Sequence, residues 1–583
     1  MDGRRCWAVT DSLVKDFKLL NIALRFFLDK KKICDKRARQ NNIFPKIYQS
    51  DDREYSNQSR SHLHVMMQFA RRSIIMKLGL CEKCGQPTDA CYEIRDNKVY
   101  LVKFCKDCGR TASLVTKDAR KWMWKREITQ YQEPACAACT LDCASCDHQQ
   151  HKKPNTVAID VTNLCNQHCP ICLAYVDAMG FAYHPPVEYF EKIFKHFQHQ
   201  EPRPNICFFG GEPTVHKDFL EIVRLAKSYG FQVQVFTNGI KLADEKYCKE
   251  LCSLGIQVNF GFDGTKKEIY QTLRGDNSLA VKKKAFENVI SCGVNRLAVI
   301  TTVANGVNDT DMENVLHFIH EYRDHVSVWG FVPLTPCWDG EVDLDPTTTE
   351  CVERIFQKLL PDIEFVPTGM MNFQVLSRFF GRQTLGGSHP NCESATLLVS
   401  DGSGYAPISA YLRAPLSELL VRLRKLDESL AATQPSSSAR GIAKRWFDIK
   451  AFASTIRIFA ESCNFRKILG KPMLWNALMA LYDLVRGDKI DHVLARRTNF
   501  QRILTLITIP YEDKGGLEDA RLHDCPAVFA YEDVDTGRIR TTAFCSWQTI
   551  KDETCRKIQA YYDRRDGQRQ QQTARMQTRT AVS

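Results

Sequence analysis

Long apolar runs are what this sequence lacks most plainly. No uninterrupted stretch approaches the roughly 20 apolar residues that a helix needs to span a bilayer. The N-terminus carries Asp2 and Asp11 and has no clean apolar core. We therefore expect neither a membrane-spanning helix nor a secretory signal peptide. The expected location is cytoplasmic, with association at a membrane surface as an alternative.

Composition narrows the class of protein further. The 583 residues are 44% hydrophobic and 25% charged, as in ordinary globular proteins, and the length allows two to four domains. The formal net charge of +12 suits an anionic partner but does not distinguish phosphate, nucleic acid and a lipid surface. The 25 cysteines, in a chain without an export signal, indicate metal binding in a reducing compartment and not disulfides.

The central motif is a group of three cysteines, Cys165, Cys169 and Cys172, directly after the apolar run Val157 to Val161. A four-iron, four-sulfur cluster ordinarily takes four cysteine ligands. Three cysteines in one tight C-x3-C-x2-C loop can therefore leave one iron open for another ligand. The alternative interpretation is half of a structural zinc site.

A second group consists of two C-x2-C pairs, Cys81 with Cys84 and Cys105 with Cys108. Two strand-like segments lie between the pairs and flank a turn at Asp96-Asn97. This arrangement predicts a four-sulfur site for one zinc or iron ion. A purely structural role and electron transfer both remain open for it.

A third group repeats the central spacing at Cys139, Cys143 and Cys146. We favour an auxiliary iron–sulfur cluster, with a zinc site completed by Cys136 or His148 as the alternative. Other cysteines fall singly in helix-like segments and are expected to be small buried hydrophobic residues; examples are Cys248, Cys252, Cys292 and Cys351.

Between residues 153 and 335, short apolar runs alternate with helical patterns. This alternation predicts an α/β fold, a partial (β/α)6 TIM-like barrel with parallel strands. The expected strands are Val157 to Val161, Ile206 to Phe209, Gln232 to Phe236, Ile256 to Phe262, Leu297 to Val303 and Val326 to Val332. The expected helices are 187–198, 216–229, 243–254, 278–291 and 310–323.

Ligands bind at the carboxyl ends of the strands in such folds, and polar or glycine-rich segments follow the predicted strands here. The paired glycines of Gly210-Gly211-Glu212-Pro213 let the backbone approach a ligand, and Glu212 can accept a hydrogen bond from an ammonium group. Other polar residues at the same edge are Asn238, Asp263 and Asn305.

Beyond the barrel, Cys392 precedes a predicted hairpin, and a helical region is expected over about 411–510. Its apolar stripe, which includes Leu474 and Leu478, predicts core packing or a wall for an apolar substrate. Cys525 and Cys545 frame another predicted hairpin. The expected domains are a basic extension (1–75), a four-cysteine module (76–130), an auxiliary cysteine loop (131–152), the barrel (153–335), a helical C-terminal region (336–550) and a disordered polar tail (551–583).

The Cys165 loop closely resembles the cluster loop of the radical S-adenosylmethionine (SAM) superfamily, and Gly210 to Pro213 resembles its GGEP motif. The order of the cysteine groups resembles the tetraether synthase and 7,8-dihydro-6-hydroxymethylpterin dimethyltransferase-like branch. The resemblance implies a [4Fe-4S] cluster on Cys165, Cys169 and Cys172, with SAM on the open iron. It also implies SAM contacts from the GGEP residues, Asp263 and Asn305.

By the same resemblance, the four-cysteine module is rubredoxin-like, with iron or zinc. One or two auxiliary clusters draw on a pool of six cysteines: Cys139, Cys143, Cys146, Cys392, Cys525 and Cys545. The resemblance does not say which of these share a cluster. A reducing partner such as ferredoxin or flavodoxin would supply electrons.

The resemblance implies reductive cleavage of SAM to a 5′-deoxyadenosyl radical that abstracts hydrogen from an unactivated C–H bond. Our first hypothesis is carbon–carbon bond formation on a lipid or isoprenoid-type alkyl chain, with peripheral membrane contact. C-methylation of a pterin-like ring is the alternative. A zinc-ribbon nucleic-acid-binding protein is the non-enzymatic alternative, but it leaves the Cys165 loop without a purpose, so no nucleic acid is expected.

Overall fold

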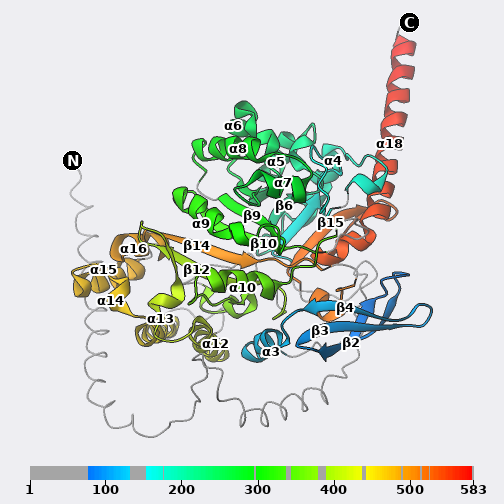
Figure 1. The fold of residues 1–583 in the computed structure, drawn as a ribbon. Coiled ribbons are helices and arrows are strands. Elements are labelled where there is room, and N and C mark those ends of the chain that lie inside the picture. The colour runs from blue at the N-terminus through cyan, green and yellow to red at the C-terminus, as the bar shows by residue number, and fades with distance from the viewer. Residues whose placement is uncertain are drawn as a thin grey trace, which may run out of the picture. The chain divides into compact units, whose positions relative to one another are not determined.

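The computed structural model (Figure 1) describes residues 77–131, 153–174, 176–294, 297–335, 343–377, 389–435, 442–486, 490–512, 515–523 and 525–580. The chain divides into two units, Met1–Arg72 and Ser73–Ser583, and all described residues belong to the second. The predicted N-terminal extension and the predicted loop with Cys139, Cys143 and Cys146 lie outside the described residues.

The N-terminal module is an antiparallel sheet in the order β1-β2-β3-β4. Its strands are β1 (Lys77–Leu80), β2 (Pro87–Arg95), β3 (Lys98–Cys105) and β4 (Gly109–Thr116), and helix α3 (Ala119–Ile128) follows. The turn between β2 and β3 falls at Asp96 and Asn97, with φ of 48° and 56°. Two consecutive positive φ values are typical of the type I′ hairpin, so the hairpin expected at this dipeptide is confirmed.

The middle of the chain forms the expected partial barrel of parallel strands, which lie side by side in sequence order. These strands are β5 (Thr156–Asp160), β6 (Asn205–Phe209), β7 (Val233–Thr237), β8 (Gln257–Gly261), β9 (Leu297–Val303) and β10 (Val326–Pro333). The covering helices are α4 (Val187–Phe197), α5 (Phe219–Ser228), α6 (Glu245–Ser253), α7 (Lys267–Arg274), α8 (Leu279–Ser291), α9 (Met312–Glu321) and α10 (Thr349–Leu359).

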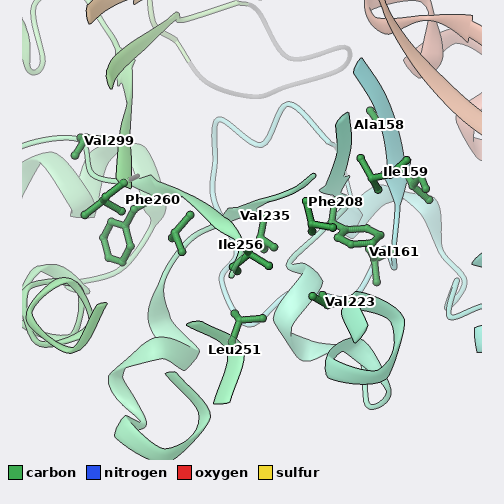
Figure 2. Packing of buried hydrophobic residues seen from close by; sticks show 14 of the residues in the cluster. Ala158, Ile159, Val161, Phe208, Val223, Val235, Leu251, Ile256, Phe260 and Val299 are labelled. Atoms are coloured by element: carbon green, nitrogen blue, oxygen red, sulfur yellow. The ribbon is translucent and has the colours of Figure 1, made fainter. Parts of the chain in front are cut away.

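Packing in the barrel core explains why the strand segments are apolar runs in the sequence. Strand side chains such as Ile159, Phe208, Val235 and Phe260 are fully buried against helix side chains such as Leu251, as Figure 2 shows. Parallel strands covered by helices bury both faces, which gives near-continuous hydrophobic runs instead of alternation.

Strands from the C-terminal third extend the sheet at both edges. On one side β14 (Arg502–Thr508) pairs parallel with β10, followed outward by β12 (Ser394–Ser400), which pairs in turn with β11 (Val366–Pro367) and β13 (Tyr405–Pro407). On the other side β15 (Ala527–Asp533) pairs parallel with β5, and β16 (Arg538–Ala543) completes the predicted hairpin. The prediction of helix up to residue 510 is therefore wrong over β14, because burial in a sheet overrides local pattern.

The C-terminal helices are α12 (Leu416–Ala432), α13 (Ile442–Ser462), α14 (Phe465–Ile468), α15 (Met473–Arg486), α16 (Ile490–Arg497), α17 (Asp519–His523) and α18 (Trp547–Thr580). Short 3-10 turns are η1 (Val176–Met179), η2 (Pro213–Val215), η3 (Ile240–Ala243), η4 (Asp309–Asp311), η5 (Thr368–Met371), η6 (Ile408–Tyr411) and η7 (Phe544–Ser546).

The expectation of a disordered tail is wrong for the described part of the C-terminus, where α18 continues to Thr580. Cys555, Ile558 and Tyr562 share one face of this helix and are buried in the barrel core. Such an i, i+3, i+7 spacing is the pattern of a packed helix. None of the helices in the described ranges is long and apolar enough to cross a membrane.

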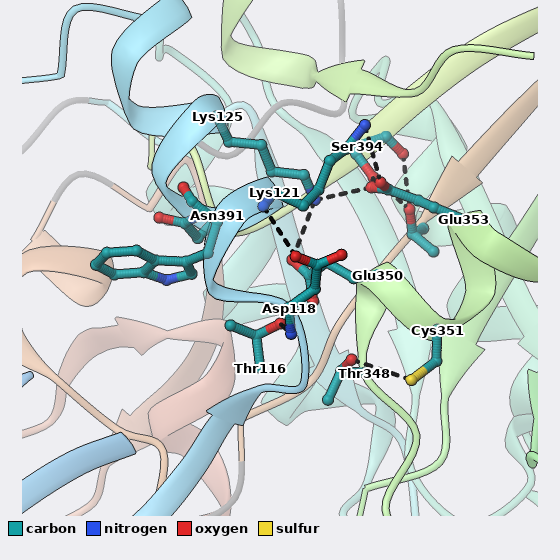
Figure 3. A network of polar contacts seen from close by, with 12 residues as sticks. Thr116, Asp118, Lys121, Lys125, Thr348, Glu350, Cys351, Glu353, Asn391 and Ser394 are labelled. Atoms are coloured by element: carbon teal, nitrogen blue, oxygen red, sulfur yellow. Dashed lines mark hydrogen bonds and ion pairs between the residues drawn. The ribbon is translucent and has the colours of Figure 1, made fainter. Parts of the chain in front are cut away.

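A buried ionic network joins α3 of the N-terminal module to α10 (Figure 3). Lys125 Nζ lies 2.7 Å from Glu353 Oε1 and 3.4 Å from Glu350 Oε1. Thr116 and Ser394 donate hydrogen bonds of 2.6 Å to these carboxylates. Burial by itself lowers the pKa of Lys125, but the two carboxylates outweigh it and the pKa lies above its usual value. The network therefore holds a charged lysine inside the contact between α3 and α10.

Candidate cluster and SAM site

The cysteine triplet lies on the loop that leaves the carboxyl end of β5. The Cys172 N–H donates to the Cys169 carbonyl at 3.1 Å, so the loop turns tightly between these two residues. All three thiols are half-buried. Burial, together with the negative charges of Glu212, Cys169 and Cys172, raises the pKa of Cys165 to about 12, although a backbone hydrogen bond from Gln167 opposes the rise. A cationic metal centre would reverse this cost by neutralising the thiolates.

Two glycines bring the end of β6 against this loop. Gly210 has a φ of +132°, and a Cβ at Gly210 or Gly211 would lie 2.3 Å or 2.4 Å from the carbonyl oxygens of Thr162 and Leu164. The Gly211 N–H donates to Thr162 O at 2.7 Å, and the Glu212 N–H donates to Leu164 O at 2.9 Å. A side chain has no room at either glycine, so the motif fixes the separation of the two loops.

Glu212 is buried and not on a solvated rim. Its Oε1 accepts hydrogen bonds from the Thr214 N–H, the Thr214 hydroxyl and the Thr237 hydroxyl, at 3.1, 2.6 and 2.8 Å. Its Oε2 accepts one from the Asn238 N–H at 2.7 Å. The carboxylate thus ties the ends of β6 and β7 together, and Oε2 retains acceptor capacity.

Asn238 joins this edge to the cysteine loop. Its Nδ2 lies 2.8 Å from Asn166 Oδ1 and 3.8 Å from Cys165 Sγ. Pro213 begins the η2 turn behind the loop and is buried. Asn305 is exposed beyond β9, where its N–H donates to the Thr347 hydroxyl at 3.1 Å. These residues come from different loops of the same barrel edge, as expected for a ligand site.

Asp263 is fully buried and engages Arg274, the last residue of α7. Arg274 Nε and Nη2 donate to its two carboxylate oxygens, both at 2.8 Å, and the Thr302 N–H donates to it at 3.0 Å. Burial acts to raise the pKa of Asp263, but the guanidinium outweighs it and the pKa lies below its usual value. Burial raises the pKa of the Cys169 thiol, and Arg274, which donates to its sulfur, opposes that rise. The structure therefore links Asp263 to the cysteine loop through Arg274.

Two more polar residues, Lys282 and Asn308, hydrogen-bond to backbone carbonyls at this edge of the barrel. Lys282 of α8 is buried, and its Nζ donates to the carbonyls of Asn238 and Gly261 at 2.6 and 2.8 Å. Burial lowers the pKa of Lys282 to about 8, although the carboxylate of Asp263 opposes this. Asn308 donates from Nδ2 to the carbonyls of Asp263 and Thr302 at 2.9 and 2.8 Å.

The four thiols of the N-terminal module come together as predicted. Cys81, Cys84, Cys105 and Cys108 place their sulfurs within 4.8 Å of one another, and the Cys84 and Cys105 sulfurs are 3.7 Å apart. Sulfurs held tetrahedrally at zinc–sulfur bonds of about 2.3 Å are about 3.8 Å apart. Gly85 and Gly109, with φ of +72° and +79°, curl the backbone after each pair. The geometry fits one tetrahedral ion.

Three of the late cysteines form a separate half-buried group. Cys392 precedes β12, Cys525 precedes β15 and Cys545 follows β16, and the three thiols interact electrostatically with one another. Burial raises the pKa of Cys392 to about 12 and that of Cys525 to about 11. Chain segments more than 130 residues apart in the sequence therefore meet at these thiols, as Cys392 and Cys525 show.

Comparison with known proteins now identifies the class. The family model of the radical SAM superfamily matches residues 159–319, and that of the HMPTM N-terminal zinc ribbon domain matches residues 78–117. The chain is 30% identical over 360 residues to a 7,8-dihydro-6-hydroxymethylpterin dimethyltransferase of Methanocaldococcus jannaschii, an alignment that spans 58% of this chain and 70% of that relative. The chain belongs to the radical SAM superfamily.

Other relatives match shorter parts of the chain. A tungsten-containing aldehyde ferredoxin oxidoreductase cofactor-modifying protein of Pyrococcus furiosus is 29% identical over 212 residues, which is 33% of this chain and 57% of the relative. A GTP 3′,8-cyclase of Clostridium botulinum is 24% identical over 194 residues, 32% of this chain and 59% of the relative. The chain spans less than two thirds of each of these two proteins.

Membership in the superfamily implies a [4Fe-4S] cluster and SAM, and the residues at the barrel edge fit both. The single-ion spacing of 4.8 Å is met, among the described residues, by the four-cysteine module and by Cys248, Cys252 and Cys292, and not by the Cys165 triplet. Wider spacing suits ligands on different irons of one cluster. The cluster would supply the electron that cleaves SAM; Arg274 and Asn238 would donate to its sulfur ligands.

Cys392, Cys525 and Cys545 fit an auxiliary metal site, and the hydrogen-bond donors of Arg521 support this fit. This buried guanidinium pairs with Glu512 through Nη1 at 2.5 Å, while its Nε and Nη2 are buried without a hydrogen-bond partner in the described part of the molecule. The positive charge acts on Cys392 and Cys545. A buried cation with unused donors beside three thiols suits an anionic thiolate-bound centre.

Sequence reasoning missed Arg274, Lys282 and Arg521. Helix α7 carries a readable signal, because Ile269, Tyr270 and Leu273 have helical spacing and are buried. Arg274 ends that helix, directly beside the glycine at position 275 with φ of +75°. The roles of Lys282 and Arg521 have no comparable local signal, since each depends on partners from distant segments.

Proposed function

We propose that this radical SAM enzyme forms a carbon–carbon bond at an unactivated C–H carbon of its substrate. The observation that carries the proposal is the second thiol group, the half-buried Cys392, Cys525 and Cys545, beside the guanidinium of Arg521. Removing hydrogen from a substrate and joining the resulting carbon to another changes the number of electrons on the organic product. A second redox centre in the same chain gives those electrons a place to go.

A lipid or isoprenoid-type alkyl chain is the first substrate candidate. Helices α13 and α15 expose large apolar side chains: Trp446 is 59%, Leu474 75% and Trp475 59% exposed. Exposed apolar groups of this size favour contact with an apolar partner. The net charge of +12 suits anionic head groups. Together these features support a lipid-like substrate reached at a membrane surface.

A pterin-like ring is the second candidate, and C-methylation would be the reaction. The observation that favours it is the relative in Methanocaldococcus jannaschii, whose name states activity as a 7,8-dihydro-6-hydroxymethylpterin dimethyltransferase. The N-terminal zinc ribbon and the barrel are both present in this chain. C-methylation also forms a carbon–carbon bond, so both candidates share the proposed reaction class.

Deuterium transfer tests the proposal and separates the candidates. The reconstituted enzyme, SAM and reduced flavodoxin would be incubated anaerobically with perdeuterated phytanyl-chain phospholipid vesicles or with a deuterated hydroxymethyl pterin. We expect deuterium in 5′-deoxyadenosine and a coupled product with one substrate class. Deuterium transfer without a new carbon–carbon bond, or transfer from neither class, contradicts the proposal.

Substitution of the exposed tryptophans sharpens the choice. If the substrate is a lipid, the double variant Trp446→Ser and Trp475→Ser should lower turnover on vesicles about tenfold or more, since each residue would lose apolar contact. Turnover on a soluble substrate should not change. Val281→Ser is the matched control, because Val281 is an exposed apolar residue on α8.

A further inference from the structure

Three cysteines that the sequence presents as isolated residues meet on the outer helices of the barrel. The Cys248 sulfur lies 4.0 Å from the Cys252 sulfur and 4.0 Å from the Cys292 sulfur. All three sulfurs fall within 4.8 Å of one another. Cys248 and Cys252 lie one turn apart on α6, and Cys292 ends α8. Cys248 is buried in the barrel core and Cys252 and Cys292 pack against it, as expected for small apolar residues, but the sequence did not predict that the three sulfurs lie together.

The spacing of these sulfurs matches a single ion with three ligands. Metal–sulfur bonds of about 2.3 Å place sulfurs about 4.0 Å apart in a trigonal plane and about 3.8 Å apart at tetrahedral angles. Two of the three sulfur pairs in the triad have the first spacing, whereas the four-cysteine module has a sulfur pair at 3.7 Å, near the second. Soft thiolates select ions such as Cu(I) and Zn(II).

The ends of two helices add an attraction for a cation. Cys252 lies in the last turn of α6 and Cys292 is the C-cap of α8. Glycines with positive φ, Gly255 at +64° and Gly293 at +70°, stop the two helices just beyond the triad. The carboxyl end of a helix carries a partial negative charge that stabilises positive ions within the last turn.

The immediate surroundings explain why the thiols need an ion to act together. Hydrogen bonding with Cys252 and burial raise the pKa of Cys248, and burial raises the pKa of Cys292. Lys249 is already paired with Glu245 on the same helix and both side chains are exposed. Metal binding would therefore release thiol protons to solvent.

We propose that Cys248, Cys252 and Cys292 bind one soft d10 metal ion, Cu(I) or Zn(II), as a three-thiolate site that clamps α6 to α8. This site is separate from the cysteine loop after β5, because α6 and α8 end at the side of the barrel where the following strands begin.

Metal counting on the full chain tests this proposal. The protein, loaded with iron, sulfide and the zinc ribbon ion, would be titrated anaerobically with Cu(I) against a chromophoric Cu(I) chelator, and separately with Zn(II) against a zinc indicator. The double variant Cys252→Ala and Cys292→Ala removes the two half-buried ligands. Cys351→Ala removes a half-buried thiol of α10 and is the matched control.

We expect the unchanged protein and the Cys351→Ala variant to bind one more equivalent of Cu(I) or Zn(II) than the double variant. X-ray absorption should show three sulfur neighbours when the ion is Cu(I), and three sulfurs with one oxygen when it is Zn(II). Equal stoichiometry in all three proteins overturns the proposal. So does isolation of Cys248 in a disulfide with either neighbour under anaerobic conditions.

A single substitution controls for a folding defect in the double variant. Cys292→Ser keeps a small polar side chain at the C-cap of α8 and should preserve the circular dichroism spectrum. It should weaken the extra equivalent at least a hundredfold, because one of three metal–sulfur bonds is lost. Unchanged affinity in this folded variant would equally overturn the three-thiolate site.

Discussion

The four-cysteine module and the cysteine loop after β5 both gather thiols, but they do so by different means. In the module, two short knuckles at the ends of one hairpin bring four sulfurs within 4.8 Å of one another. In the loop, the three sulfurs come from a single short segment, and their surroundings come from β6, β7, α7 and α8. The first site is complete within a local fold. The second site takes its three thiol ligands from the loop, and the residues around those thiols come from the rest of the barrel.

Removal of the loop thiols should have the largest effect. The triple variant Cys165→Ala, Cys169→Ala and Cys172→Ala should lose one [4Fe-4S] cluster and all production of 5′-deoxyadenosine, while the barrel folds through its own apolar core. Iron and sulfide analysis with chromatography of the products measures both. The ribbon metal should remain bound, and undiminished 5′-deoxyadenosine would refute the assignment.

Substitution of one cysteine in the four-cysteine module should disrupt that site and leave the cysteine loop after β5 intact. Cys84→Ser should release the ribbon ion, because a structural zinc site of this kind is worth about 10–16 kcal/mol and depends on each thiolate. Hydrogen exchange should increase in β2 and β3, while iron content at the Cys165 loop stays the same. Loss of both centres together would show that the two regions do not fold independently.

Substitution of Glu212 tests whether this residue of the barrel edge binds SAM. A charge-assisted hydrogen bond to the methionine ammonium is worth about 1.5–3 kcal/mol, so Glu212→Gln should weaken SAM about ten- to hundredfold. Isothermal titration of the reconstituted protein measures this. Glu221→Gln, on the exposed face of α5, is the control.

Cluster content decides between two roles of Glu212. If the carboxylate acts only by joining the ends of β6 and β7 through Thr214, Thr237 and Asn238, an amide facing the Asn238 N–H would loosen the loop and reduce iron content. Normal iron content with unchanged SAM affinity would contradict the proposed ammonium contact.

The smallest effect is expected from substitution of Arg274, and it should be measurable as a change in the reduction potential of the cluster. Its guanidinium donates to the Cys169 sulfur, and positive charge favours the reduced, more negative cluster. Arg274→Gln should lower the reduction potential by about several tens of millivolts, since about 59 mV is tenfold for one electron. Potentiometry followed by electron paramagnetic resonance measures the shift. Arg274→Lys should retain part of it, and equal potentials in all three proteins would exclude this role.

The sequence was informative wherever one segment determines the outcome. Apolar runs located the barrel strands to within a residue or two, because strands buried on both faces must be apolar. The two C-x2-C pairs and the Asp96-Asn97 turn predicted the ribbon for an equally local reason. Strand β14 was missed because its neighbours β10 and β12, and not its own pattern, decide its structure.

The cysteine ligands and the polar segments of the candidate site were predictable from the sequence, but the contacts among them were not. Asp263 was expected to contact SAM, and that remains a proposal, but its carboxylate is engaged by Arg274 and Thr302. Nothing in the sequence relates Arg274 to Cys169, since the contact requires the end of α7 to fold back over the loop. The meeting of Cys248, Cys252 and Cys292 was hidden for the same reason.

The attachment of β14 and β15 to opposite edges of the barrel sheet has a consequence for synthesis on the ribosome. Strands β5 to β10 emerge first, but the edge of β10 is not covered until Arg502–Thr508 has been made, and the edge of β5 not until Ala527–Asp533. A nascent chain that ends at Ser400 therefore presents uncovered hydrogen-bonding edges on a hydrophobic sheet, the kind of surface that recruits other chains. Nascent-chain crosslinking should find chaperones on these edges and lose them once β15 has left the exit tunnel.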